Sequence, residues 1–157
     1  MTSDVETRAC DDDHQALRLW LRLLTCTNLI EADVRRRLTQ RFSITLPRFD
    51  LMAQLDRCPD GLTMSELSKR MMVTGGNVTG ITDQVEREGY VVREVMPHDR
   101  RVCRVRLTEA GRKVFAEMAA EHECWVKDLM AGLSEAEVKV LLDLLGRLKT
   151  HMVALKS

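Results

Sequence analysis

The chain has 157 residues, of which 45% are hydrophobic, and its 24 Lys and Arg residues balance 24 Asp and Glu residues. This hydrophobic content is too high for a disordered chain, and the length suits one domain. No apolar run approaches the roughly 18 residues that span a bilayer, and residues 1–13 are acidic where a signal peptide is basic, so we expect a cytoplasmic protein.

Charge is distributed unevenly along the chain. Residues 1–13 carry five acids and one Arg, a net −4, and we expect this acidic segment to be mobile. Residues 18–48 carry seven Arg against Glu31 and Asp33, a net +5. Eighteen of the 24 cations are Arg, whose planar fork suits phosphates, carboxylates and base edges, although genome composition also produces Arg-rich chains.

Helical periodicity runs through the first half of the chain. Apolar side chains recur at three- and four-residue steps over residues 14–40 without Gly or Pro, which predicts one long amphipathic helix. A second helix is predicted to open at Thr45, with Pro47 in its first turn, and to stop before a Pro-Asp-Gly turn. The run Thr-Met-Ser-Glu at 63–66 is a capping box that begins a short helix to about Met71.

The period changes in the second half. A further helix with one apolar face is predicted to stop at Gly89. Residues 90–96 and 102–107 then alternate, which predicts the two strands of a hairpin with residues 97–101 at its tip. Thr108 is expected to cap the start of the helix that follows the hairpin. The last helix follows a break and opens on a second capping box.

Two short helices joined by a tight turn and followed at once by a basic hairpin are typical of a winged helix-turn-helix, whose second helix lies in the DNA major groove. Residues 93–106 carry five Arg against two acids, a net +3, where an electrostatic footprint for DNA is expected. The terminal helices carry more apolar surface than so small a chain covers alone. Pairing of two chains through these helices resolves the mismatch.

The predicted fold class is therefore mostly α with a small β-hairpin wing, arranged as one compact unit. We expect residues 45–108 to form the winged helix-turn-helix and residues 14–44 and 109–157 to form a helical dimerisation region. A two-fold dimer places two reading helices about one DNA turn, roughly 34 Å, apart, which suits a pseudo-palindromic operator.

The stretch from residue 78 to residue 112 resembles the MarR-type winged-helix regulators. It carries V-T-x-I at 78–81, E-G-Y-V at 88–91, D-x-R at 99–101 and L-T-E-A-G at 107–111, and the helix order extends the resemblance over nearly all of the chain. The resemblance implies a homodimeric repressor that binds a near-palindromic promoter site and is released by a small effector. Motifs of hydrolases and nucleotide-binding enzymes are missing, so we do not expect an enzyme.

The resemblance also implies which residues contact DNA. In the wing motif Asp99 is implied to brace the hairpin and Arg101 to enter the minor groove, whereas the alternative is a charged tip that protects an exposed edge. The reading helix departs from the family pattern in its glycines, among them Gly80, so we expect backbone contacts to phosphates at its start and few base-reading side chains. The predicted DNA-binding set is Ser65, Thr74, Gly75, Gly76, Asn77, Thr79, Thr82, Gln84, Arg93, Asp99, Arg100 and Arg101.

Residues 16–24 show a second, narrower resemblance, to the first helix of MarR-type regulators of hydroxycinnamate catabolism. Those regulators respond to coumaroyl- or feruloyl-coenzyme A thioesters. A coenzyme A carries roughly four negative charges, and their docking on the arginines at 35–37 would cancel the field that attracts DNA. The alternative is a solvated helix end, because three successive residues fan around a helix.

Apolar and aromatic residues suggest an effector pocket where the long helix meets the second and fifth helices. The alternative for each of them is ordinary core packing. Arg48 is predicted as a carboxylate or phosphate anchor, or else as a solvated helix charge. The predicted effector-binding set is Trp20, Cys26, Arg36, Arg37, Arg48, Phe49, Met52 and Trp125.

The five cysteines contain no C-x-x-C pair, which predicts reduced thiols and neither a disulfide framework nor a zinc knuckle. Cys26 allows a redox-sensing alternative, although core filling is the expected role of an unpaired Cys on an apolar helix. We expect no metal and no cofactor. A winged-helix protein-interaction module is a further alternative, because fold does not fix function.

Overall fold

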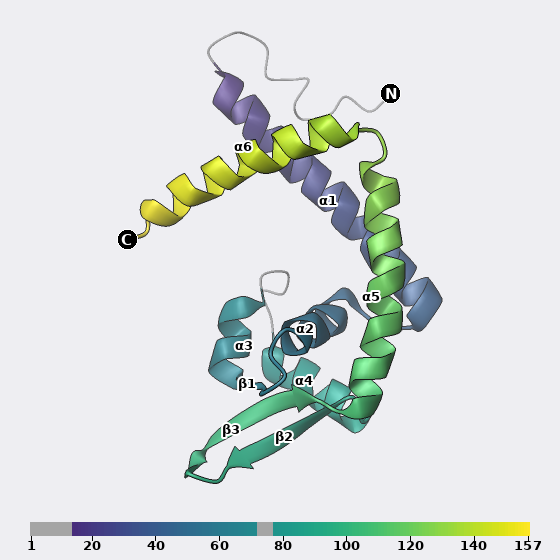
Figure 1. Ribbon diagram of the computed structural model, residues 1–157, viewed down its shortest axis with the longest axis vertical. Helices are drawn as coiled ribbons and strands as arrows, with labels where there is room; N and C mark the ends of the chain where they lie inside the picture. The colour runs from purple at the N-terminus through teal and green to yellow at the C-terminus, as the bar shows by residue number, and fades with distance from the viewer. Residues whose placement is uncertain (1–13, 72–76) are drawn as a thin grey trace. The chain divides into compact units, whose positions relative to one another are not determined.

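The computed structural model describes residues 14–71 and 77–157, so the acidic segment 1–13 lies outside the described residues. The elements, in chain order, are α1 (Gln15–Phe42), α2 (Leu46–Asp56), β1 (Leu62–Thr63), α3 (Met64–Arg70), α4 (Val78–Arg87), β2 (Val91–Met96), β3 (Asp99–Leu107), α5 (Glu109–Met130) and α6 (Glu135–Ala154) (Figure 1). The predicted mostly helical fold with a small wing is confirmed. The chain divides into two compact units, one ending at His122 and one spanning Glu123–Ser157.

The helix boundaries follow local capping chemistry. α3 opens on the predicted capping box, in which the Glu66 backbone N–H donates to Thr63 Oγ1 at 3.2 Å and the Thr63 N–H donates to Glu66 Oε2 at 2.8 Å. The same reciprocal pair joins Ser134 and Glu137 at the start of α6, at 3.2 and 2.7 Å. Each box satisfies two backbone donors that a helix start leaves unpaired, so both predicted starts are confirmed.

The sheet has three antiparallel strands in the order β1-β3-β2, and its β2–β3 hairpin extends away from the helices α2–α4 (Figure 1). β1 was not predicted, because two residues are too few to show an alternating pattern. The predicted five-residue tip is wrong. β3 already begins at Asp99, which pairs with Met96, and the register shifts between Val95 and Met96. Polar residues at 99–101 give no apolar alternation, so the start of the strand was hidden.

The core of the first unit lies between α1–α5 and the sheet. α2 contacts α4 and β3, and α4 contacts β2, so the helices of the central motif are held against the wing strands. Side chains that are almost completely buried fix this arrangement: Leu38, Leu51, Met52, Leu55, Leu67, Val85, Val105 and Met118. Burial of each such side chain contributes about 1.5–3 kcal/mol to folding.

The junction between α4, β2 and α5 is unusually close. Gly89, at φ +81°, ends the turn after α4, as the sequence predicted. The Thr108 N–H then donates to the Tyr90 carbonyl at 3.0 Å, while the Thr108 hydroxyl donates to the Gly89 carbonyl at 2.7 Å and accepts from the Gly111 N–H at 3.0 Å. Thr108 therefore caps α5, as predicted, and draws the first turn of α5 onto the Tyr90 backbone.

The two terminal helices expose apolar residues. Within the described chain, no residue of α6 is buried, although Leu and Val make up much of its length. α1 buries Val34 and Leu38 in its second half, while its first half exposes large apolar side chains. These exposed residues are Leu17, Leu19, Trp20, Leu24 and Leu29 in α1 and Val140, Leu141, Leu142, Leu144, Leu145, Leu148, Met152 and Val153 in α6. In the part of the chain that is described, no helix is long and apolar enough to cross a membrane.

Candidate nucleic-acid interface

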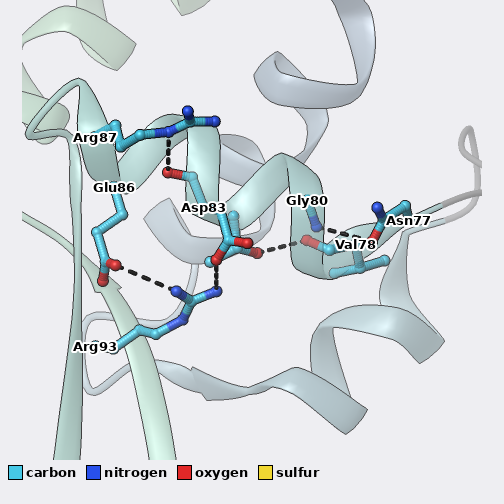
Figure 2. Close-up of polar contacts among 8 residues, drawn as sticks. Asn77, Val78, Gly80, Asp83, Glu86, Arg87 and Arg93 are labelled. Atoms are coloured by element: carbon cyan, nitrogen blue, oxygen red, sulfur yellow. Dashed lines mark hydrogen bonds and ion pairs between the residues drawn. The ribbon is translucent and has the colours of Figure 1, made fainter.

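α4, the predicted reading helix, begins with a side-chain cap. Asn77 Oδ1 accepts a hydrogen bond from the Gly80 N–H at 2.8 Å (Figure 2). A Cβ atom at position 80 would lie 2.5 Å from Asn77 Nδ2 and 3.0 Å from its Cγ, so glycine leaves room for the cap. Gly80 costs helix propensity, and the capping bond offsets that cost by about 1 kcal/mol.

The exposed face of α4 carries few side chains that could read bases. Asn77, Thr79 and Gln84 are at least partly exposed, as base-reading residues must be. Thr82 is fully buried, and its hydroxyl donates to the Val78 carbonyl at 2.7 Å. The prediction that Thr82 reads bases is therefore corrected: the helical period places it on the same inner face as Val78 and Val85. Ser65 is exposed in the first turn of α3, and Thr74, Gly75 and Gly76 lie outside the described residues.

Arg93 lies on wing strand β2, and its side chain contacts α4. Its guanidinium Nη2 is 2.6 Å from Asp83 Oδ1, and its Nη1 is 3.2 Å from Glu86 Oε1 (Figure 2). The hydrogen bond to Asp83 raises the pKa of Arg93 above its ordinary value. Both arms of the fork are therefore engaged by carboxylates of α4, and the DNA contact by Arg93 stays a prediction.

The wing tip presents two exposed arginines, Arg100 and Arg101. Asp99 Oδ1 accepts a hydrogen bond from the Arg101 backbone N–H at 3.0 Å, which is the bracing contact that the wing motif implies. The Arg101 side chain is 95% exposed. Arg104 instead donates to the Gly61 carbonyl at 3.0 Å, and Arg106 pairs with Glu94. The charge available to DNA on the wing is therefore concentrated at its tip.

Arg48 forms an ion pair that sequence reasoning missed. Its guanidinium contacts the carboxylate of Glu88, the residue that ends α4, and Arg48 is only 8% exposed. It is neither the solvated charge nor an open anchor for an effector, so that prediction is corrected. Arg48 and Glu88 are far apart in the chain, and no local sequence pattern predicts a contact between them.

The residues predicted for an aromatic pocket differ in their exposure. Trp20 is 56% exposed, whereas Phe49 and Met52 are core residues. The Phe49 ring centroid lies 5.5 Å from that of Phe115 and 4.9 Å from that of His122. Phe49 and Met52 therefore pack in the core, and the prediction that they line an effector pocket is wrong. Trp125 is buried and belongs to the second unit.

The predicted phosphate-docking arginines of α1 are already paired within the helix. Arg36 contacts Asp33, and Arg37 Nε lies 2.6 Å from Asp33 Oδ2. The hydrogen bond from Arg36, ahead of the contacts of Arg37, lowers the pKa of Asp33. Arg35 contacts Glu31 in the same way. An anion that docks here must compete with these carboxylates.

The described cysteines are free thiols, and Cys26 is exposed on α1, which corrects the expectation that it fills the core. Cys26, Cys58, Cys103 and Cys124 form no disulfide among the described residues. Residues 14–71 and 77–157 also contain no group of three or more His, Cys, Asp or Glu side chains that could hold a metal ion.

Comparisons with known proteins agree on one family. The MarR family model matches residues 44–103. An uncharacterized HTH-type transcriptional regulator of Bacillus cereus is 30% identical over 137 residues, which cover 85% of this chain and 88% of that protein. The HTH-type transcriptional regulator PecS of Dickeya dadantii is 28% identical over 72% of this chain and 69% of its own.

Solved structures give the same result. A MarR family transcriptional regulator from Silicibacter pomeroyi is 33% identical, with a TM-score of 0.74 over 90% of this chain and 99% of that chain. FabT of Streptococcus pneumoniae, solved in complex with DNA, is 29% identical, with a TM-score of 0.73 over 90% and 99% of the two chains. These relatives favour neither a redox switch nor a protein-interaction module. The chain belongs to the MarR family of winged-helix, DNA-binding transcriptional regulators, and it is not an enzyme.

Proposed function

We propose that the protein is a homodimeric repressor that acts in the cytoplasm and binds a pseudo-palindromic operator. The observation that carries the proposal is the pairing of an accessible polar face on α4 with two exposed arginines at the wing tip. Asn77, Thr79 and Gln84 would read base edges in the major groove, and Arg100 and Arg101 would follow the neighbouring minor groove. FabT, a relative solved in complex with DNA, supports the proposal that this chain binds DNA.

The dimer is proposed from the exposed apolar residues of α1 and α6, which belong to the regions 14–44 and 109–157. Exposed apolar patches of this extent mark interaction surfaces on proteins. Burial of these side chains against a second copy would stabilise the dimer by about 25 cal/mol for each Å² of apolar surface removed from water. A two-fold axis would also present both copies of residues 45–108 to one duplex.

Charged substitutions on α6 test the dimer and its DNA binding together. A Leu145→Glu, Leu148→Glu variant should sediment at 18.0 kDa, whereas the wild type should sediment at twice that mass. Each buried Leu contributes about 1.5–3 kcal/mol, so the dimer dissociation constant should rise more than about a hundredfold. The same variant should lose the mobility shift that the wild type gives with DNA from upstream of its own gene.

Lys139→Glu, an exposed change on the same helix, is the matched control and should remain dimeric and active in the shift assay. A wild type that sediments as a monomer, or a double variant that stays dimeric, contradicts the proposed dimer. A dimeric wild type that shifts none of its upstream DNA contradicts the proposed operator there.

We further propose that a small aromatic effector releases the repressor, with a hydroxycinnamoyl-coenzyme A thioester as the specific candidate. The proposal rests on the resemblance of residues 16–24 and on two features of α1. Trp20 offers an exposed aromatic face. One face of the helix carries Asn28, Glu31, Ala32, Arg35, Arg36, Thr39 and Gln40, which includes two cations for the phosphates of a coenzyme A.

Thermal unfolding with coumaroyl-coenzyme A, free coumaric acid and free coenzyme A tests the effector. At a hundred times its dissociation constant, the thioester should raise the free energy of unfolding by about 2.7 kcal/mol. An Arg36→Ala, Arg37→Ala variant should show a smaller rise, and Lys139→Glu should respond as the wild type does. The proposal fails if the thioester produces no shift, or if the double variant responds as fully as the wild type.

A further inference from the structure

The reading helix of this DNA-binding protein is acidic. Residues 78–88, which comprise α4 and its last cap, carry Asp83, Glu86 and Glu88 against Arg87, a net −2. DNA carries one negative charge per roughly 1.7 Å of helix axis, so an acidic helix that enters its groove is repelled. Either the helix does not approach DNA or its carboxylates are neutralised by other residues.

Each of these carboxylates is held by an arginine from another element. Arg93 on β2 contacts both Asp83, at 2.6 Å, and Glu86, at 3.2 Å (Figure 2). Arg48 on α2 contacts Glu88. Two arginines that flank α4 therefore pair with three carboxylates, and together with Arg87 they bring the net charge of this group to zero.

Arg93 is the better placed of the two to affect DNA binding. Its side chain is 26% exposed, while those of Asp83 and Glu86 are 49% and 38% exposed, so the two carboxylates remain close to solvent on a helix that faces DNA. The guanidinium offers separate N–H donors to the two acids, which a lysine ammonium cannot match in geometry. Pairs this exposed contribute only about 0–1 kcal/mol to stability, so global folding does not depend on them.

We propose that Arg93 is a positioning residue for DNA binding: it holds and neutralises Asp83 and Glu86 so that α4 can approach the phosphates, and it does not contact DNA itself. The inference rests on the proposed operator binding. It predicts that the harm done by losing Arg93 comes from the two carboxylates it releases. Removing those carboxylates should then restore binding.

The experiment compares the full-length wild type, Arg93→Ala, and the triple variant Arg93→Ala, Asp83→Asn, Glu86→Gln. The probe is a fluorescein-labelled duplex that the wild type selects from a random-sequence pool, and anisotropy gives the dissociation constant at several KCl concentrations. Arg93→Ala removes one positive charge per subunit and leaves two carboxylates without their shared partner, which should weaken binding by about tenfold to a hundredfold. The triple variant should return to within about threefold of the wild type and keep its salt dependence.

The competing explanations give different results. If Arg93 contacts a phosphate, the salt slope of Arg93→Ala falls by about 1.8 per dimer, and the triple variant does not recover that slope. If Arg93 merely supports the fold, the thermal midpoints of both variants fall and the triple variant is not rescued. Either result overturns the inference. A wild type that selects no duplex overturns operator binding itself, whereas a binding wild type without rescue overturns only the role of Arg93.

Discussion

Replacing Gly111 with alanine is expected to destabilise the protein by about 3 kcal/mol or more. The reason is the close junction at the start of α5, where Thr108 draws the first helical turn onto the Tyr90 backbone. A Cβ atom at position 111 would overlap the Tyr90 carbonyl oxygen and lie 2.9 Å from the Tyr90 carbonyl carbon. Both groups are backbone atoms within a hydrogen-bonded turn, so neither has a flexible end that could move aside.

Thermal and urea unfolding followed by circular dichroism measure this effect. Gly132→Ala is the matched control, because a Cβ atom there meets nothing within 4 Å, and its midpoint should stay close to that of the wild type. Gly111→Ala should show a much lower midpoint or no cooperative transition. A Gly111→Ala protein as stable as the wild type would show that the junction at Tyr90 is looser than described.

Replacing Arg101 with alanine is expected to weaken operator binding by about tenfold or more. Its side chain is 95% exposed at the wing tip, and its Nε lies 4.0 Å from the Asp99 carboxylate, so its charge is available to the minor groove. The Asp99 bond to the backbone N–H of residue 101 survives the substitution, so the hairpin should keep its conformation. The loss is therefore electrostatic.

Titration of labelled operator at several salt concentrations separates this effect from misfolding. Loss of one cation per subunit should reduce the slope of log K against log salt by about 1.8 per dimer. Arg147→Ala, which removes an exposed arginine from α6, is the control and should bind as the wild type does. An unchanged slope in Arg101→Ala would assign the wing arginine to the alternative role, protection of an exposed strand edge.

Much of the fold could be predicted because the ends of its helices are set by interactions between residues three or four apart in the chain. The two capping boxes, the proline in the first turn of α2 and Gly89 after α4 act over three or four residues, and all were read from the sequence. The failures have the same origin. β1 is two residues long, and β3 starts among arginines that show no apolar period, so neither feature has a local signature.

The candidate interface was less predictable because its key contacts are long-range. Thr82 could have been placed correctly, since it lies four residues after the apolar Val78 on a helix. Arg48 and Arg93 could not. Their charges look available to a ligand or to DNA in the sequence, and only the fold brings them to the carboxylates of α4 and its cap. Counting arginines therefore overstated the positive charge that the wing presents.

The Asn77 cap has a consequence for engineering altered promoter preference. Any side chain introduced at position 80 must push the Asn77 amide aside, so the capping bond that orders the start of α4 is lost. Libraries designed to retarget this regulator should therefore vary Thr79 and Gln84 and keep Gly80 fixed. A biosensor built on the chain would then gain new specificity without losing the rigid start of its reading helix.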